Sequence, residues 1–131
     1  MMAGVLILAC MDARVTDLLA DDLDERYPHA YKIRLAGASK AVVRRTSRPT
    51  VLQDIGLAIT KGVEHIVIAD HMDCAAFQGS KNEERAHRLS MHQAATIIQQ
   101  QYPQVDVELY LIGKRHQTVR HIESIPSIAH A

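Results

Sequence analysis

Two short segments each place a cysteine and an aspartate just after an apolar run. They are "LACMDARV" (8–15) and "IADHMDCA" (68–75), and they contain the only two cysteines of the chain, Cys10 and Cys74. His71 stands three positions before Cys74. Thiolates and imidazoles are preferred ligands of Zn²⁺, and a catalytic zinc takes three protein ligands and leaves one position for water. These residues predict a zinc site made by Cys10, His71 and Cys74.

Asp12 and Arg14 follow Cys10 at alternate positions. Arginine can hold a carboxylate through two hydrogen bonds and fix its direction. An aspartate held in this way can accept a hydrogen bond from zinc-bound water and orient the resulting hydroxide. Asp12 could instead swing onto the metal and close its open position, and in isolation this spacing more often gives a surface ion pair. We take Asp12 and Arg14 as candidate catalytic residues.

The cysteines allow two other interpretations. Cysteine is among the most buried residue types, so Cys10 and Cys74 could be ordinary core residues beside an unrelated histidine. They could also form a redox disulfide, although no C-x-x-C pair is present. Their matching positions after apolar runs favour the metal site over both alternatives.

Strand-like and helix-like patterns alternate along the chain. Apolar runs predict buried strands at 4–10 and 64–70, and strand-like patterns predict further strands at 30–37 and 105–113. Helical spacing predicts helices at 15–26, 49–61, 82–101 and 117–123. This order predicts an α/β fold, a three-layer α/β/α arrangement with a mostly parallel sheet of about four strands in the order 2-1-3-4. Ligands bind such sheets beyond the carboxyl ends of the strands, where the strand order reverses, and both cysteine segments lie at that end.

The composition limits the class of protein. The 131 residues fit a single domain, 1–131, with 47% hydrophobic and 23% charged residues. The formal net charge is zero, so neither nucleic acid nor a membrane surface is an expected partner. The N-terminal apolar run has no basic region before it and is too short to span a bilayer, which indicates a cytoplasmic protein. Two cysteines in a reducing compartment are expected to be free thiols or metal ligands.

Three segments together resemble the beta-class carbonic anhydrases. "CMDARV", "RLAG" (34–37) and "HMDCA" are similar to that family's C-x-D-x-R, R-N-A-G and H-x-x-C-G motifs, in the same order and after the same strands. The resemblance covers residues 4–77 well and the rest loosely. It implies that Cys10, His71 and Cys74 bind Zn²⁺ and that Asp12 and Arg14 form the catalytic dyad. It also implies reversible hydration of carbon dioxide to bicarbonate by zinc-bound hydroxide, in a homodimer or higher homo-oligomer.

The sequence departs from the family pattern at several points. Leu35 replaces the asparagine of R-N-A-G, and Ala75 replaces the glycine after the second cysteine. Only nine residues precede Cys10, so we expect the family's N-terminal helical arm and its glutamine to be missing. Aromatic residues make up 4% of the chain, whereas the family's pocket has an aromatic wall. Two alternative functions stay open: a non-catalytic zinc-binding protein, or a hydrolase of another small electrophile such as carbon disulfide or carbonyl sulfide.

Other polar residues receive structural interpretations. His87 and His92 lie five apart on the expected long helix, which is not the spacing of a helical metal pair, so we place them on the surface. Asp73 is expected to shape the turn or to accept a hydrogen bond near the metal. The basic stretch 40–48 is expected to be a solvated loop rather than an anion site.

Overall fold

Five strands form one sheet at the centre of the molecule. The computed structural model describes residues 4–113, 115 and 117–130. The strands are β1 (Gly4–Ala9), β2 (Tyr31–Arg34), β3 (Val63–His71), β4 (Asp106–Ile112) and β5 (Val119–Ile125). Their order is β2-β1-β3-β4-β5; the first four are parallel, and β5 pairs antiparallel with β4. The predicted α/β class, the mostly parallel sheet and the order 2-1-3-4 are therefore confirmed, with a fifth strand added.

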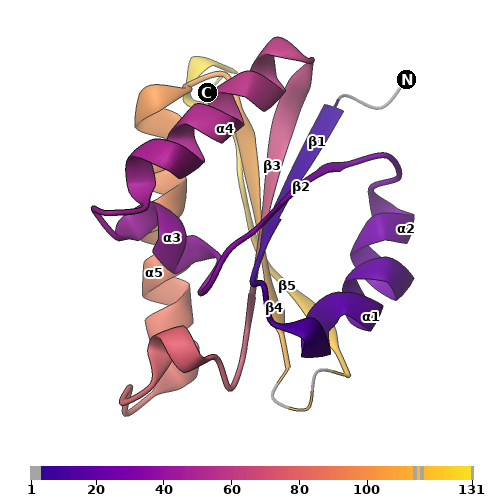
Figure 1. Ribbon diagram of the computed structural model, residues 1–131. Coiled ribbons are helices and arrows are strands. Elements are labelled where there is room, and N and C mark those ends of the chain that lie inside the picture. The colour runs from indigo at the N-terminus through magenta and orange to yellow at the C-terminus, as the bar shows by residue number, and fades with distance from the viewer. Residues whose placement is uncertain (1–3, 114, 116, 131) are drawn as a thin grey trace.

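Helices cover both faces of this sheet and complete the three layers (Figure 1). One face carries α3 (Ser39–Val43), α4 (Arg48–Thr60) and α5 (Glu83–Gln101). The other carries α1 (Thr16–Leu18) and α2 (Asp24–Arg26), joined by a π-helical turn at Leu19–Leu23. Short 3-10 turns occupy Ala13–Val15, Ala75–Phe77 and Ile128–His130. Within the described ranges, no helix is both long and apolar enough to cross a bilayer.

The two faces of the sheet build two separate hydrophobic cores. Side chains alternate along a strand, so neighbouring residues enter different cores. On β3, Ile66 and Ile68 pack toward the α3–α5 layer, while Val67 packs with Leu19 and Leu23 on the other side. Because both faces are covered, β1 and β3 appear in the sequence as continuous apolar runs, which explains why their positions could be predicted.

The helix expected at 117–123 is wrong, because this segment belongs to β5. Val119, Ile122 and Ile125 stand three residues apart, a spacing that imitates one face of a helix. In the structure the segment lies at the edge of the sheet, and its backbone pairs with β4 from Ile112 back to Val107. An edge strand that is only partly buried does not need the continuous apolar run of its neighbours, so its sequence lacked that signal.

The core beneath α5 should contribute more to the free energy of unfolding than the exposed face of that helix, which a pair of leucine substitutions tests. Leu109 is fully buried in the core beneath α5, so Leu109→Ala should lower the free energy of unfolding by about 2–5 kcal/mol. Leu89 on α5 is 55% exposed, and Leu89→Ala should change it by less than about 0.5 kcal/mol. Urea denaturation followed by circular dichroism measures both values. Equal losses in the two variants would contradict the assigned core.

Candidate metal centre

Cys10, His71 and Cys74 meet where β1 and β3 end. Their ligand atoms all lie within 4.8 Å of one another, and the two sulfurs are 4.0 Å apart. All three residues are buried. A tetrahedral zinc with Zn–S bonds of about 2.3 Å places two sulfurs about 3.8 Å apart. The spacing and the chemistry of this donor set therefore fit a zinc ion with three protein ligands.

The ring of His71 is oriented by a backbone carbonyl. Its Nδ1 lies 2.8 Å from the carbonyl oxygen of Met72, and because a carbonyl only accepts, Nδ1 must donate. In the neutral ring this leaves the lone pair on Nε2, the atom that a metal would bind. Nε2 also lies 3.9 Å from Oδ2 of Asp12, so the candidate ligand faces the candidate catalytic carboxylate.

The Cys10 and Cys74 thiols are hydrogen-bonded to each other, with their sulfurs 4.0 Å apart. The hydrogen bond from Cys74 lowers the pKa of the Cys10 thiol, against the effect of burial, and backbone hydrogen bonds from Gly37 and Asp12 lower it further. The same contact with Cys10, together with burial, raises the pKa of Cys74. The hydrogen-bonded pair therefore favours a single negative charge, and a bound metal cation would favour loss of the second proton. This is the behaviour of a pair of thiolate ligands.

Asp12 and Arg14 form a closed pair beside this cluster. The Asp12 carboxylate caps the 3-10 turn Ala13–Val15 by accepting from the backbone N–H of Arg14 at 2.9 Å. Nε of Arg14 lies 3.1 Å from each carboxylate oxygen, and Nη2 lies 2.6 Å from Oδ2. Hydrogen bonds from the Arg14 side chain hold the pKa of Asp12 well below its usual range. The carboxylate therefore stays ionised and keeps a fixed direction.

Arg14 also joins the two cysteine segments. Its Nη1 donates to Oδ2 of Asp73 at 3.1 Å, and its Nη2 donates to the Asp73 carbonyl at 3.0 Å. Asp73 has a positive φ of 58°, which aspartate tolerates better than most residues. The turn role expected for Asp73 thus includes a contact with Arg14 across the site.

The "RLAG" segment supports the first cysteine from β2. Arg34 donates from Nε and Nη2 to the Cys10 carbonyl, at 3.0 and 2.9 Å, and from Nη2 to the Asp12 carbonyl at 2.9 Å. Gly37 has a φ of 83°, and a Cβ there would lie only 2.9 Å from Cβ of Lys40. A larger residue would be strained at this position, where the backbone hydrogen-bonds to Cys10.

His87 is not on the surface, and that prediction is wrong. The side chain is fully buried, and its two ring nitrogens contact carboxylates: Nδ1 lies 2.7 Å from Oδ2 of Asp70, and Nε2 lies 2.9 Å from Oε2 of Glu83. His87 shares the buried face of α5 with Met91 and Ala94. These residues are spaced four and three positions apart and so share one helical face, a signal in the sequence that could have revealed the burial of His87. His92, by contrast, is exposed as expected.

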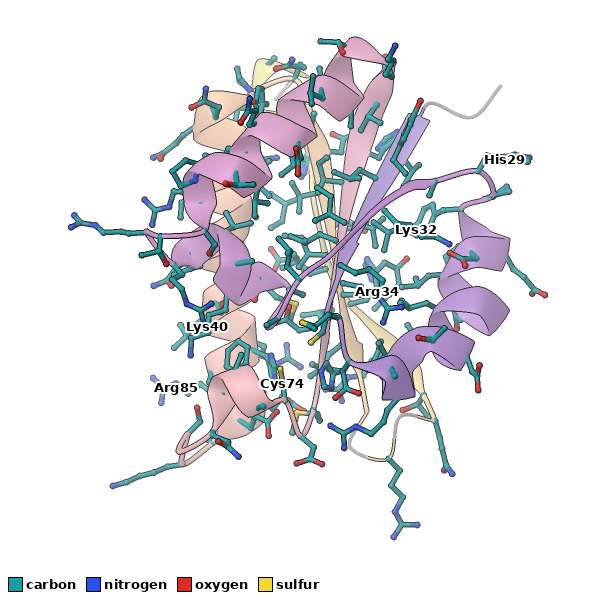
Figure 2. All side chains as sticks on the ribbon, in the orientation of Figure 1. His29, Lys32, Arg34, Lys40, Cys74 and Arg85 are labelled. Atoms are coloured by element: carbon teal, nitrogen blue, oxygen red, sulfur yellow. The ribbon has the colours of Figure 1, made fainter. Side chains whose placement is uncertain are left out.

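The basic stretch 40–48 is only in part a solvated loop: Arg44, Arg45 and Thr46 are exposed, whereas its first residues belong to a helix. Residues Ser39–Val43 form α3, and Lys40 donates to the Ala76 carbonyl at 2.6 Å while lying over the ring of Phe77. Arg48 donates to backbone carbonyls of α3. Lys40 thereby ties this segment to the turn after Cys74; Figure 2 shows Lys40 and Cys74 on the side of α3 and α5.

Comparison with known proteins identifies the family. A family model described as "putative carbonic anhydrase" matches residues 2–123. The chain belongs to this carbonic anhydrase family. An uncharacterized protein of Rickettsia bellii is 29% identical over 138 residues, covering 85% of this chain and 77% of its own length. An uncharacterized protein of Rickettsia conorii is 28% identical over 148 residues, covering 95% of this chain and 75% of its own length.

Solved carbonic anhydrases share the fold. The enzyme from Streptococcus mutans superimposes with a TM-score of 0.59 at 20% identity, over 91% of this chain and 81% of the other. A beta-carbonic anhydrase of Trichomonas vaginalis gives a TM-score of 0.58 at 16% identity, over 94% and 82%. The chain is therefore a divergent member of the family with its sheet and helices retained.

Protonation of His87 should make stability depend on pH. Burial opposes the charge, but the hydrogen bonds to Asp70 and Glu83 outweigh it and raise the pKa of His87 above 6.5. The stabilisation should be complete below pH 6.5 and should be lost as pH rises through the raised folded-state pKa. His87→Gln should thus cost roughly 3–5 kcal/mol at pH 5.5 and less at pH 9, measured by urea denaturation.

The control for this prediction is the exposed histidine of the same helix. His92→Gln, at a side chain that is 50% exposed, should alter the free energy of unfolding by less than about 1 kcal/mol at either pH. A difference between His87→Gln and wild type that stays constant from pH 5.5 to pH 9 would show that folding does not raise the pKa of His87.

Proposed function

We propose that this protein catalyses the zinc-dependent reversible hydration of carbon dioxide to bicarbonate. The observation that carries the proposal is the buried cluster of Cys10, His71 and Cys74, with the Asp12 carboxylate held 3.9 Å from Nε2 of His71. Family membership supports the same activity. Zinc bound by these residues would lower the pKa of a water molecule and supply a nucleophile for the carbon of CO₂ at neutral pH.

The protein's own residues then have separate tasks. Two thiolates balance the charge of a dication, so the buried site carries no large net charge. Asp12 is ionised and only accepts hydrogen bonds, so it would orient a water or hydroxide hydrogen and leave the oxygen lone pair aimed at substrate. Arg14 keeps Asp12 in that direction. Asp12 would stay a hydrogen-bond acceptor rather than a metal ligand as long as that pair is intact.

Zinc analysis and stopped-flow hydration of CO₂ test this proposal. Wild type should carry about one zinc per chain and hydrate CO₂. Cys74→Ser removes a thiolate and should lose both metal and activity. Asp12→Asn should keep the metal but lower kcat by about 100-fold or more, because the oriented acceptor is lost. Asp17→Asn, at an exposed carboxylate on α1, should behave as wild type.

Other outcomes separate the remaining functions. A Cys74→Ser variant as active as wild type would exclude the mechanism. Full zinc occupancy without hydration between pH 7 and 9 would favour a non-catalytic zinc-binding protein. Hydrolysis of carbon disulfide or carbonyl sulfide, without CO₂ hydration, would assign another small electrophile as substrate.

We further propose that two chains pair through the open edge of the sheet at β2. This strand ends the sheet and has one edge unpaired within the described residues, which makes it available to another chain. Tyr31 and Leu57 beside it are 47% and 61% exposed, and they line a groove with Ile33 and Ala58. An isologous contact would bury this apolar surface in both copies. The two thiol ligands further favour a reducing compartment, the cytoplasm.

Substitution in this groove tests the dimer. Leu57→Lys should place a charge in the interface and convert the dimer to a monomer, as measured by sedimentation velocity. Leu89→Lys is the control, since Leu89 is similarly exposed on α5. A wild-type monomer, or a Leu57→Lys dimer as stable as wild type, would contradict this interface.

A further inference from the structure

The loop that carries Cys74 depends on contacts made by other elements. Between β3 and the turn Ala75–Phe77, Asp73 adopts the left-handed region that few residues tolerate. The backbone N–H of Cys74 donates to Oε2 of Glu83 at 3.1 Å, in the first turn of α5. The Cys74 carbonyl accepts from the N–H of Phe77 at 2.9 Å. A side chain of α5 therefore fixes the backbone at a candidate metal ligand.

Glu83 is itself held by a buried chain of hydrogen bonds. The Oε2 atom that accepts from Cys74 also lies 2.9 Å from Nε2 of His87. The other ring nitrogen of His87 lies 2.7 Å from Oδ2 of Asp70, the residue before His71. Asp70 in turn accepts from the backbone N–H and the hydroxyl of Ser39 on α3, at 3.0 and 2.7 Å. The chain thus runs from α3 through β3 and α5 to the metal loop.

We propose that Glu83 and His87 are positioning residues of the metal centre, which set the placement of Cys74 relative to His71 so that the ligands are ready for a tetrahedral ion. The inference rests on the proposed zinc function. One end of the chain is Asp70, bonded in sequence to one ligand, and the other end is the N–H of a second ligand. Because the imidazole between them is rigid, it fixes the distance between these two ends.

The desolvation cost of burying the polar side chains of His87 and Asp70 indicates that they have a role beyond packing. His87 and Asp70 have fully buried side chains, and apolar residues of similar volume would often stabilise such a position equally well or better. The ring of His87 also packs at 3.9 Å from that of Phe77, in the turn after Cys74. Hydrogen bonds and ring packing therefore both act on the same loop. Residues that orient metal ligands in this way typically contribute 10- to 100-fold in metal affinity.

Matched variants at the start of α5 test the proposal. Glu83→Ala removes the acceptor for Cys74, and Glu83→Gln keeps an acceptor but removes the charge that holds His87. Glu84→Ala and Glu84→Gln are the controls, because Glu84 also lies in the first turn of α5 but binds Arg88 and Arg120 on the surface. The Glu84 variants therefore remove the same negative charge from the first turn of α5 as the Glu83 variants do.

Two measurements report on the site without using activity. Zinc affinity is measured by competition with a chromophoric chelator, and the Co²⁺-substituted protein is examined for its thiolate charge-transfer and d–d bands. Glu83→Ala should weaken zinc binding by about 10- to 100-fold and shift the Co²⁺ bands, with Glu83→Gln intermediate, while the Glu84 variants stay within about threefold of wild type. Circular dichroism melts of the metal-free proteins identify any variant that fails to fold. If Glu83→Ala does not fold, the metal binding of Glu83→Gln tests the proposal.

The results distinguish this inference from the proposed function. Zinc affinity and Co²⁺ bands that are the same in the Glu83 and Glu84 variants would overturn the positioning role while leaving the metal centre intact. A wild-type protein that binds neither metal would overturn the proposed function itself. Weaker zinc binding and shifted Co²⁺ bands in the folded Glu83 variants, with both properties unchanged in the Glu84 variants, is the result that supports positioning.

Discussion

A buried carboxylate near the end of the central strand sets the main constraint on this structure. Asp70 is 1% exposed, and an ionised carboxylate at such a site is costly unless every available partner is used. The partners come from two helices: Ser39 from α3 and His87 from α5. Both helices must therefore pack at fixed positions against β3. The hydroxyl of Ser39 also lies 2.8 Å from that of Ser90, which adds a second contact between α3 and α5.

The alternation of side chains along a strand explains why the buried Asp70 and the candidate metal centre can be adjacent and still have separate partners. Asp70 and His71 are consecutive residues of β3, so their side chains leave opposite faces of the sheet. Asp70 points with Ile66 and Ile68 toward α3 and α5, whereas His71 points toward the side of Asp12. One residue pair thus connects the helix layer to the strand end. The cysteines complete the cluster from beyond the ends of β1 and β3, where the backbone no longer alternates.

The features that sequence could predict were those with a strong local signal. The inner parallel strands β1 and β3 are covered on both faces and therefore appear as apolar runs, and the cysteine segments follow these two strands directly. The antiparallel edge strand β5 and the buried His87 could not be found in this way. The apolar residues of β5 imitate a helix. His87 has a local signal in its helical spacing with Glu83, Met91 and Ala94, but its partner Asp70 lies 17 residues away on β3, and only the folded chain brings these two into contact. Pairing between Arg14 and Asp73 was hidden for the same reason.

The departures from the family motifs fall where the backbone, rather than the side chain, has the structural task. At Leu35 the N–H donates to the Ala9 carbonyl at 3.0 Å, a contact that any residue except proline can make, and the side chain packs against the core beneath α3 and α5. The polar support of the Cys10 loop comes from Arg34, the first residue of the same motif, which binds the carbonyls of Cys10 and Asp12. Ala75 is exposed, so its methyl group is accommodated in solvent. Two motifs can thus each lose one characteristic residue while the atoms that hold the candidate ligands keep their partners.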